Sequence, residues 1–243
     1  MGISSTLSSG MTVPLTAPLT SVFPDQRPAP AVDAVCYETV YDGVDDSFKS
    51  TDASLEISGE QTYEFECYIG SGAGHHYIFN SRATVTGEGG LYFTYHDSGA
   101  LQFFCTLFST TGTGYRQAFL KTLPSPTLNW KKVVIVSSSS SLDFYIDGVA
   151  ADVFAGTGSF TMGTPNNGIT LGGDNFGGDF ANVRTRKFAM HSGAATNAAD
   201  YSSGVDSTLL GVTEVARSND GGTTWETGQS FTKSGDPTRQ LCT

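Results

Sequence analysis

The chain has few basic residues and no long apolar run. Its 243 residues contain 13 Lys and Arg against 24 Asp and Glu, which gives a formal net charge of −11. Nucleic-acid phosphates are bound by clustered basic side chains, so this composition argues against a nucleic-acid partner. No apolar run approaches the roughly 18 residues that a membrane-spanning helix needs. We therefore expect neither nucleic acid nor membrane among its partners.

Several motifs of enzymes and metalloproteins are also missing. The four cysteines never occur as Cys-x-x-Cys, so we expect no thiolate metal site. No serine lies in a Gly-x-Ser-x-Gly elbow, and no glycine run opens a helix to hold a phosphate. His75 and His76 are adjacent, and adjacent strand residues point to opposite faces, so the pair cannot chelate one ion from a regular strand. We expect no cofactor.

The cysteines fall into two pairs by position. Cys67 and Cys105 share the inward period of their segments, which predicts buried thiols. Cys36 and Cys242 flank the central part of the chain and could pair if the termini meet. Assembly inside a cytoplasm would keep thiols reduced, so we expect free thiols at all four positions.

The clearest structural signal is a β-hairpin. Val133–Val136 reads as a strand, Ser137–Ser141 as a polar bend, and Leu142, Phe144 and Ile146 alternate with polar residues as in a strand buried on one face. Asp147-Gly148 then supplies a two-residue turn with positive φ. Similar short runs, separated by Gly, Ser, Thr and Asn clusters, recur along the middle of the chain without any helical stripe, which predicts one all-β domain.

These residues resemble those of a known family. Trp130-x-x-Val133 followed by Leu142-x-x-Tyr145-x-Asp147-Gly148 is similar to a motif of the laminin-G-like, or concanavalin-A-like, jelly-roll family. Segments 62–69, 90–104 and 169–184 resemble its other core strands in the same order, so the resemblance covers roughly residues 38–203. It implies an all-β, two-sheet antiparallel jelly-roll sandwich, here with an extended N-terminal arm.

We divide the chain into three parts. Residues 1–35 contain five prolines, which remove backbone donors and favour an extended arm. Residues 36–205 form the sandwich. Residues 206–243 are predicted to form a C-terminal β-hairpin extension with a single Asp-box, Ser218-x-Asp220-x-Gly222-x-Thr224-Trp225. The Asp-box is a structural turn in sialidase-like propellers, and sialidase activity does not follow from one copy.

The first functional hypothesis is a non-enzymatic virion structural protein. Laminin-G-like modules usually act outside cells, yet the sequence begins without the basic start and apolar centre of a secretory signal. A bacteriophage protein assembled in the host cytoplasm and released by lysis resolves this conflict. It would be a capsid decoration or cement protein, a homo-oligomer attached to the major capsid or other virion proteins by its arm; a disordered linker is the alternative reading of that segment. The arm's apolar candidates for partner binding are Leu15, Leu19, Val22 and Phe23.

The alternative is a glycan-binding adhesin or tail-fibre module. Sugar rings stack on exposed aromatic side chains. The candidates on alternating strand positions or loops are Tyr92, Tyr95, Tyr115 and Tyr145.

A glycoside hydrolase is a third hypothesis, because relatives of this fold hydrolyse glycans with paired acids. Glu64 and Glu66 share one face of a strand, but the segment lacks the family's Glu-x-Asp-x-x-Glu pattern, so we interpret them as ordinary solvent-facing acids. Arg184, Arg186 and Lys187, like Lys131 and Lys132, are interpreted as solvated strand faces.

A calcium site is implied only by the resemblance, since some relatives bind calcium through loop oxygens. Asp174 and Asp179 in the glycine-rich loop are the weak candidates, and a flexible turn is the competing interpretation.

Overall fold

The computed structural model describes residues 35–70, 72–81, 89–109, 115–124, 126–127, 129–139, 141–154, 168–174, 177–196, 198 and 212–243. Only the backbone is described at 115–122 and 152–154. The chain divides into two units, Met1–Ala34 and Val35–Thr243. The first unit, and with it the predicted arm, lies outside the described residues, so the account below concerns the second.

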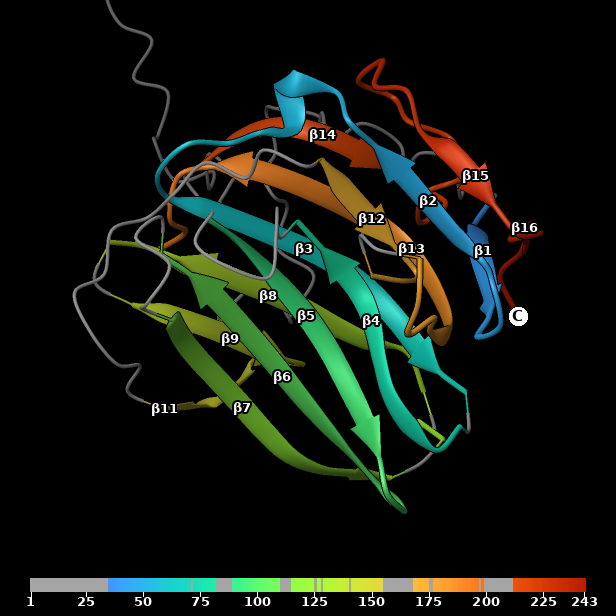
Figure 1. Cartoon of the computed structure of the whole chain (residues 1–243), viewed down its shortest axis with the longest axis horizontal. Coiled ribbons are helices and arrows are strands. Elements are labelled where there is room, and N and C mark those ends of the chain that lie inside the picture. The colour runs from blue at the N-terminus through green and yellow to red at the C-terminus, as the bar shows by residue number, and fades with distance from the viewer. Residues whose placement is uncertain are drawn as a thin grey trace, which may run out of the picture. The chain divides into compact units, whose positions relative to one another are not determined.

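The second unit is built from two antiparallel sheets, as predicted (Figure 1). Sheet A has seven strands in one continuous order and an eighth, β14 (Thr213–Ser218), which pairs with β13 outside that order. The continuous order is β10 (Val149–Ala150), β9 (Leu142–Ile146), β8 (Lys131–Ser137), β3 (Gln61–Ile69), β13 (Asn182–Ser192), β1 (Tyr37–Asp42) and β16 (Thr238–Leu241).

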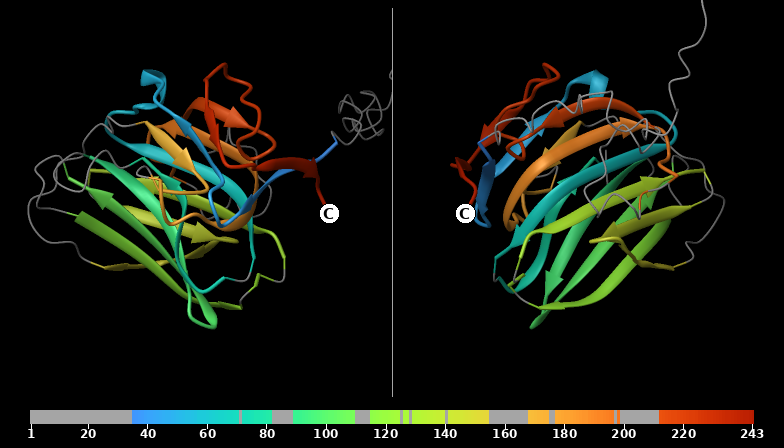
Figure 2. Two further views of the ribbon diagram at one scale, coloured as in Figure 1. Left: turned by 45° about the vertical axis from the view of Figure 1, so that its right-hand side comes forward. Right: turned by 180° about the vertical axis from the view of Figure 1, so that it is seen from behind.

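Sheet B runs in the order β11 (Asp152–Phe154), β7 (Tyr115–Pro124), β6 (Ala100–Phe108), β5 (Gly90–Asp97), β4 (Gly74–Asn80), β12 (Ile169–Leu171), β2 (Ser47–Ser50) and β15 (Thr232–Ser234). A 3₁₀ turn, Ala53–Leu55, is capped by Asp52. Within the described ranges, no helix has the length and apolarity to cross a bilayer. Figure 2 shows the two sheets as layers of one sandwich.

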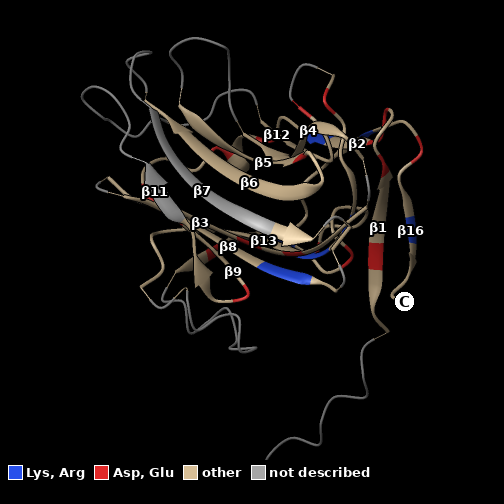
Figure 3. Cartoon of the chain, turned by 90° about the horizontal axis from the view of Figure 1, so that it is seen from below, with Lys and Arg blue, Asp and Glu red and all other residues tan. Residues whose placement is uncertain are grey.

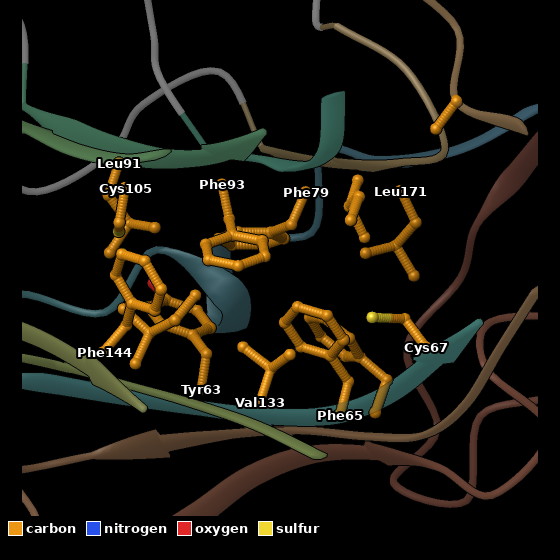
Figure 4. Packing of buried hydrophobic residues seen from close by; sticks show 14 of the residues in the cluster. Tyr63, Phe65, Cys67, Phe79, Leu91, Phe93, Cys105, Val133, Phe144 and Leu171 are labelled. Atoms are coloured by element: carbon orange, nitrogen blue, oxygen red, sulfur yellow. The ribbon is translucent and has the colours of Figure 1, made fainter. Parts of the chain in front are cut away.

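The core lies between the sheets and is dominated by aromatic rings. Strand alternation directs Tyr63 and Phe65 of β3 inward, where they meet Phe79 and Phe93 of sheet B at centroid distances of 4.7 and 5.6 Å (Figure 4). All four residues are fully buried. Burying each large apolar side chain contributes roughly 1.5–3 kcal/mol, so this layer joins the sheets. Cys67 and Cys105 are buried free thiols within the same core, as expected.

The hairpin predicted from the sequence is confirmed. β8 pairs with β9 in antiparallel register, with Val133 opposite Ile146 and Ser137 opposite Leu142. Asp147 and Gly148 have φ values of 50° and 78°, both in the left-handed region that a type I′ turn requires. Leu142, Phe144 and Ile146 are buried on the inner face of sheet A.

The C-terminal segment differs from the predicted hairpin extension. β14 pairs with β13 in sheet A, whereas β15 pairs with β2 in sheet B, so the strands on either side of the Asp-box do not pair with each other. β16 then returns to sheet A beside β1. The segment is therefore part of both sheets rather than an appendage. β15 and β16 add to the edge strands β2 and β1, and β14 pairs with the part of β13 that lies beyond β1.

The Asp-box turn fastens this segment to the sandwich. Asp220 is 2% exposed and accepts hydrogen bonds from Ser218, Thr224 and Arg239. The carbonyl of Gly221 accepts from Tyr41 and Thr185 at 3.0 and 2.9 Å. A Cβ at Gly221, which has a φ of +77°, would lie 2.1 Å from the Thr185 carbonyl oxygen, so this close approach requires glycine.

The expectation of reduced thiols is wrong for Cys36 and Cys242. The two form a disulfide with a Cα–Cα distance of 5.4 Å. β1 and β16 are neighbours in sheet A, and the Cys242 amide donates to the Cys36 carbonyl at 3.0 Å, which brings the side chains together. Composition alone could not show that the two ends of the sandwich are paired strands.

Candidate functional site

The outer face of sheet B carries a row of aromatic side chains. His75 and Tyr77 of β4, Tyr92 of β5 and Phe108 of β6 lie in succession, with centroid distances of 5.2, 5.2 and 5.6 Å. We call these four residues the aromatic row. His75 is exposed, and the other three are half-buried. Residues of opposite parity on the same strands, such as Phe93, point into the core.

A second, polar row crosses the same face at right angles to the strands. Its residues are direct cross-strand partners on successive strands, from β15 to β6: Thr232, Lys49, Thr170, Asn80, Tyr92 and Thr106. Neighbouring strands lie about 4.8 Å apart, so the row extends over about 24 Å. Tyr92 belongs to both rows. Thr170, Asn80 and Thr106 are buried, whereas Lys49 and Tyr92 are half-buried and Thr232 is exposed. The row is therefore accessible at Thr232, Lys49 and Tyr92.

A pocket opens at the β2–β12–β15 end of this face. It encloses about 700 Å³. Hydroxyl groups dominate its lining, including those of Ser50, Thr170 and Thr232, and Phe180 contributes a ring. Two lysines, Lys49 and Lys233, and two aspartates, Asp52 and Asp174, are its charged residues. Such a lining offers both donors and acceptors, which suits a ligand rich in hydroxyl groups.

The aspartates of the pocket also stabilise local turns. Asp52 accepts hydrogen bonds from the Ser54 amide and hydroxyl at 2.9 and 2.8 Å, and these bonds lower the pKa of its carboxyl group. Asp174 Oδ1 accepts from the Gly178 amide at 2.6 Å. Lys233 is paired with the exposed Asp236 at 3.2 Å.

The tyrosines predicted to bind glycan are not all on this surface. Tyr92 is in the aromatic row. Tyr95 corrects the prediction, because it is fully buried and its ring packs against Phe103 and His76. Tyr145 lies on the outer face of sheet A against Val134 and Val136. Tyr115 begins β7 opposite Phe108 in register, but its side chain lies outside the described part.

The remaining predicted residues have separate positions. Leu15, Leu19, Val22 and Phe23 lie outside the described residues. Asp174 lines the pocket, whereas Asp179 has a φ of 49° and its carbonyl accepts from the Tyr77 amide. Within the described ranges, the carboxylates close enough to share an ion are a different group, Asp42, Asp45 and Asp46. No observation at Asp174 and Asp179 adds to the calcium hypothesis.

The adjacent histidines diverge, as predicted. His75 points to the outer face, where its ring contacts Tyr77 and its Nε2 lies 3.1 Å from the Thr94 hydroxyl. The His76 ring packs against that of the buried Tyr95 at a centroid distance of 5.0 Å, and its Nδ1 lies 2.6 Å from the Phe180 carbonyl oxygen. Partial desolvation of the His75 ring by its neighbours lowers its pKa; the nearby charge of Asp179 opposes this shift, and His96 and His76 add to it.

Glu64 and Glu66 face outward from sheet A, as their parity predicts, but the expectation that they face solvent is wrong. Glu64 is 0% exposed, and its Oε1 lies 2.9 Å from His191 Nε2 and 3.4 Å from Arg217. Glu66 is 4% exposed and pairs with Arg186 and Lys187 at 2.5 and 3.0 Å. Burial would raise the Glu66 pKa, but the hydrogen bonds and charges of Lys187 and Arg186 outweigh it and lower the pKa.

The family of the chain can be recognised from its sequence. Residues 42–199 match the family described as the concanavalin A-like lectin/glucanases superfamily. The chain belongs to this superfamily. The family description includes both lectins and glucanases, so membership alone does not separate binding from hydrolysis. No curated protein matches the sequence.

Solved structures share the fold at low identity. A native heptameric SAP-like pentraxin from Limulus polyphemus is 13% identical, with a TM-score of 0.56 over 87% of this chain and 97% of its own. A protein from Bacteroides ovatus ATCC 8483 that is thought to bind carbohydrate is 16% identical, with a TM-score of 0.55 over 85% and 60%. The receptor-binding domain of botulinum neurotoxin mosaic serotype C/D is 14% identical, with a TM-score of 0.53 over 71% and 43%. The chain thus spans less than two thirds of the last two.

Sequence reasoning missed Tyr77, Phe108 and the hydroxyl-rich pocket. Tyr77 and His75 show the strand alternation, and that signal could have identified them as outward-facing residues. The pocket could not be found this way, because its residues come from β2, β12 and β15, which are distant in sequence and meet only in the folded sheet.

Proposed function

We propose that this chain is a non-catalytic glycan-binding module whose ligand lies across the outer face of sheet B. The observation that carries the proposal is the aromatic row beside a hydroxyl-lined pocket of about 700 Å³. Aromatic rings stack on the apolar faces of sugar rings, while hydroxyl and lysine donors bind the sugar's oxygens. One of the solved structures with a similar fold is a protein thought to bind carbohydrate, which agrees with this proposal.

The surroundings of Glu64 and Glu66 support binding rather than hydrolysis. A general acid of a glycosidase needs a raised pKa and access to the glycosidic oxygen. The Glu66 pKa is lowered, and both acids are buried in ion pairs. They also lie on the sheet opposite the pocket. This arrangement gives neither of them a place in a two-acid mechanism on sheet B.

A glycan array with the full chain, followed by calorimetric titration of its strongest binder, tests the proposal. Tyr92→Ala should weaken binding at least tenfold, the loss of roughly 1.4 kcal/mol expected for a central aromatic contact. Tyr145→Ala removes a tyrosine of comparable burial from the other sheet and should leave the affinity unchanged. An array without binders, or equal affinities for the wild type and Tyr92→Ala, would contradict the proposal.

Attachment to a bacteriophage particle through residues 1–35 is a second proposal. It is supported by the five prolines of that segment and by the acidic charge, which suits an outward surface away from packaged DNA. The particle would carry many copies, as a homo-oligomer bound to capsid proteins. Mass spectrometry of purified virions tests it, since a decoration protein should be present in hundreds of copies and a tail protein in a few. Deleting residues 1–33 should abolish attachment, and complete absence of the chain would reject the proposal.

A further inference from the structure

We propose a second binding site, for a sugar that carries a carboxylate or sulfate group, on the outer face of sheet A. It consists of Tyr68, Trp130, Arg184, Arg186 and Lys187, which we call the cation–aromatic cluster. The cluster is on the opposite sheet from the aromatic row and shares no residue with it. The inference therefore stands independently of the proposed function.

Strand register brings these side chains together. β13 lies beside β3, so Arg184 is opposite Tyr68 and Arg186 is opposite Glu66. The Arg184 guanidinium lies 4.2 Å from the centroid of the Tyr68 ring, and that of Arg186 lies 4.1 Å from the Trp130 ring. The two rings are 6.3 Å apart. Arginine and aromatic groups thus alternate on one surface, in contacts of the cation–π type.

The acids of this region lie beneath the cations. Arg184 pairs with Glu38 at 3.0 Å, and Glu66 pairs with both Arg186 and Lys187. The Glu38 and Glu66 side chains are 0% and 5% exposed, whereas those of Arg184, Arg186 and Lys187 are 23%, 19% and 50% exposed. An approaching ligand therefore meets the positive groups. Lys132, opposite Glu66 on β8, adds a further cation on the same face.

This surface contrasts with the charge of the whole chain. The net charge is −11, yet this end of sheet A gathers three cations over two covered acids. In Figure 3 a blue segment lies on β8 of sheet A, whereas β6 of sheet B is tan. A local positive surface on an acidic protein favours a ligand that places an anionic group directly on the cluster.

The chemistry of the cluster indicates the class of ligand. A guanidinium presents planar paired donors that match a carboxylate or sulfate, and Lys187 adds a point charge. The half-buried rings of Tyr68 and Trp130 each have a guanidinium over one face, so they hold the arginines in place and contribute apolar area beside the charged groups. A pyranose with an acidic substituent meets both requirements at once. Uronic acids and sulfated sugars are the two sources of that chemistry.

Calorimetry of the full chain with three polymers tests the inference. Dextran sulfate provides sulfate, polygalacturonate provides carboxylate, and dextran is the neutral control. We expect a charged polymer to bind at about 0.05 M salt and to weaken at least fivefold at about 0.5 M, because exposed charges are screened. Whichever charged polymer binds more tightly identifies the group recognised. Absence of binding to both would overturn the inference, as would equally tight binding of single-stranded DNA.

Two variants locate the site. Lys187 has a φ of 53°, a conformation that asparagine tolerates, so Lys187→Asn removes the charge with little backbone strain. It should weaken binding about three- to fivefold. Arg186→Gln should weaken it further, and its thermal unfolding shows whether the variant is folded. Lys121→Gln removes one positive charge from β7 in the other sheet and is the charge control. Unchanged affinity in Lys187→Asn would overturn the inference even if Arg186→Gln fails to fold.

Discussion

Tyr95 of β5 and Asn182 of β13 are joined by two hydrogen bonds that connect the sheets. The Tyr95 hydroxyl donates to the Asn182 carbonyl at 3.3 Å and accepts from the Asn182 amide at 3.1 Å. Burial raises the Tyr95 pKa well above its ordinary value, with smaller contributions from the hydrogen bond and nearby charges. Because the hydroxyl satisfies both groups of one peptide position, Tyr95 is a structural residue and not a sugar ligand.

Tyr95→Phe should therefore destabilise the fold by about 1–3 kcal/mol, since it removes two hydrogen bonds between the sheets at about 0.5–1.5 kcal/mol each. The Gly70 amide still donates to the Asn182 carbonyl in the variant. Tyr145→Phe, on the outer face of sheet A, should change the free energy of unfolding by less than about 0.5 kcal/mol. Urea unfolding monitored by fluorescence compares the two. Equal midpoints for Tyr95→Phe and the wild type would show that the two hydrogen bonds add nothing to stability.

The alternation in β5 explains how much the sequence could predict. Tyr92 and Tyr95 are three residues apart, so a regular strand places them on opposite faces, and Leu91 and Phe93 identify the inner set. Applied strictly, this rule separates the sugar candidate from the core residue. For Glu64 and Glu66, parity predicted the outer face correctly. Their burial depends on partners 120 to 153 residues away, such as Arg186 and Arg217, and no local pattern shows which side chains will lie across the sheet.

The Cys36–Cys242 disulfide should make stability sensitive to reductant. It links residues 206 positions apart, so it restricts the unfolded chain strongly, and its reduction should cost about 3–4 kcal/mol. Unfolding with and without dithiothreitol measures this cost. The double variant Cys36→Ser with Cys242→Ser should have about the stability of the reduced wild type, whether or not dithiothreitol is present. Thiol titration of the unreduced, denatured protein should find two thiols, from Cys67 and Cys105; four would contradict the disulfide.

Asp220→Ala should loosen the C-terminal segment. The Asp220 carboxylate is buried, accepts hydrogen bonds from the Ser218 hydroxyl and the Thr224 amide, and pairs with Arg239 at 2.8 Å. Its removal leaves these donors without their acceptor, which we expect to cost about 2–4 kcal/mol.

Asp236→Ala is the control for that change, because the Asp236 side chain is 100% exposed and pairs with the half-exposed Lys233. It should alter stability by less than about 0.5 kcal/mol. Hydrogen exchange adds a local readout, since Asp220→Ala should lose protection first in β14 and β15. If protection there stays at the wild-type level, the Asp-box does not hold the segment in place.

The ion pairs of Glu66 should make stability fall in acid. Its pKa is lowered in the folded state, so the folded protein binds the proton less readily than the unfolded chain. The stabilisation is therefore present above the ordinary glutamate pKa of about 4.3 and is lost as the pH falls through the lower folded value. Glu66→Gln should be about 1–3 kcal/mol less stable than the wild type at neutral pH. That difference should shrink below about pH 4, where protonated glutamate resembles glutamine. Urea midpoints measured across this range, with the exposed Glu60→Gln as control, test the argument; a difference that stays constant with pH would show that proton binding at Glu66 does not set acid stability.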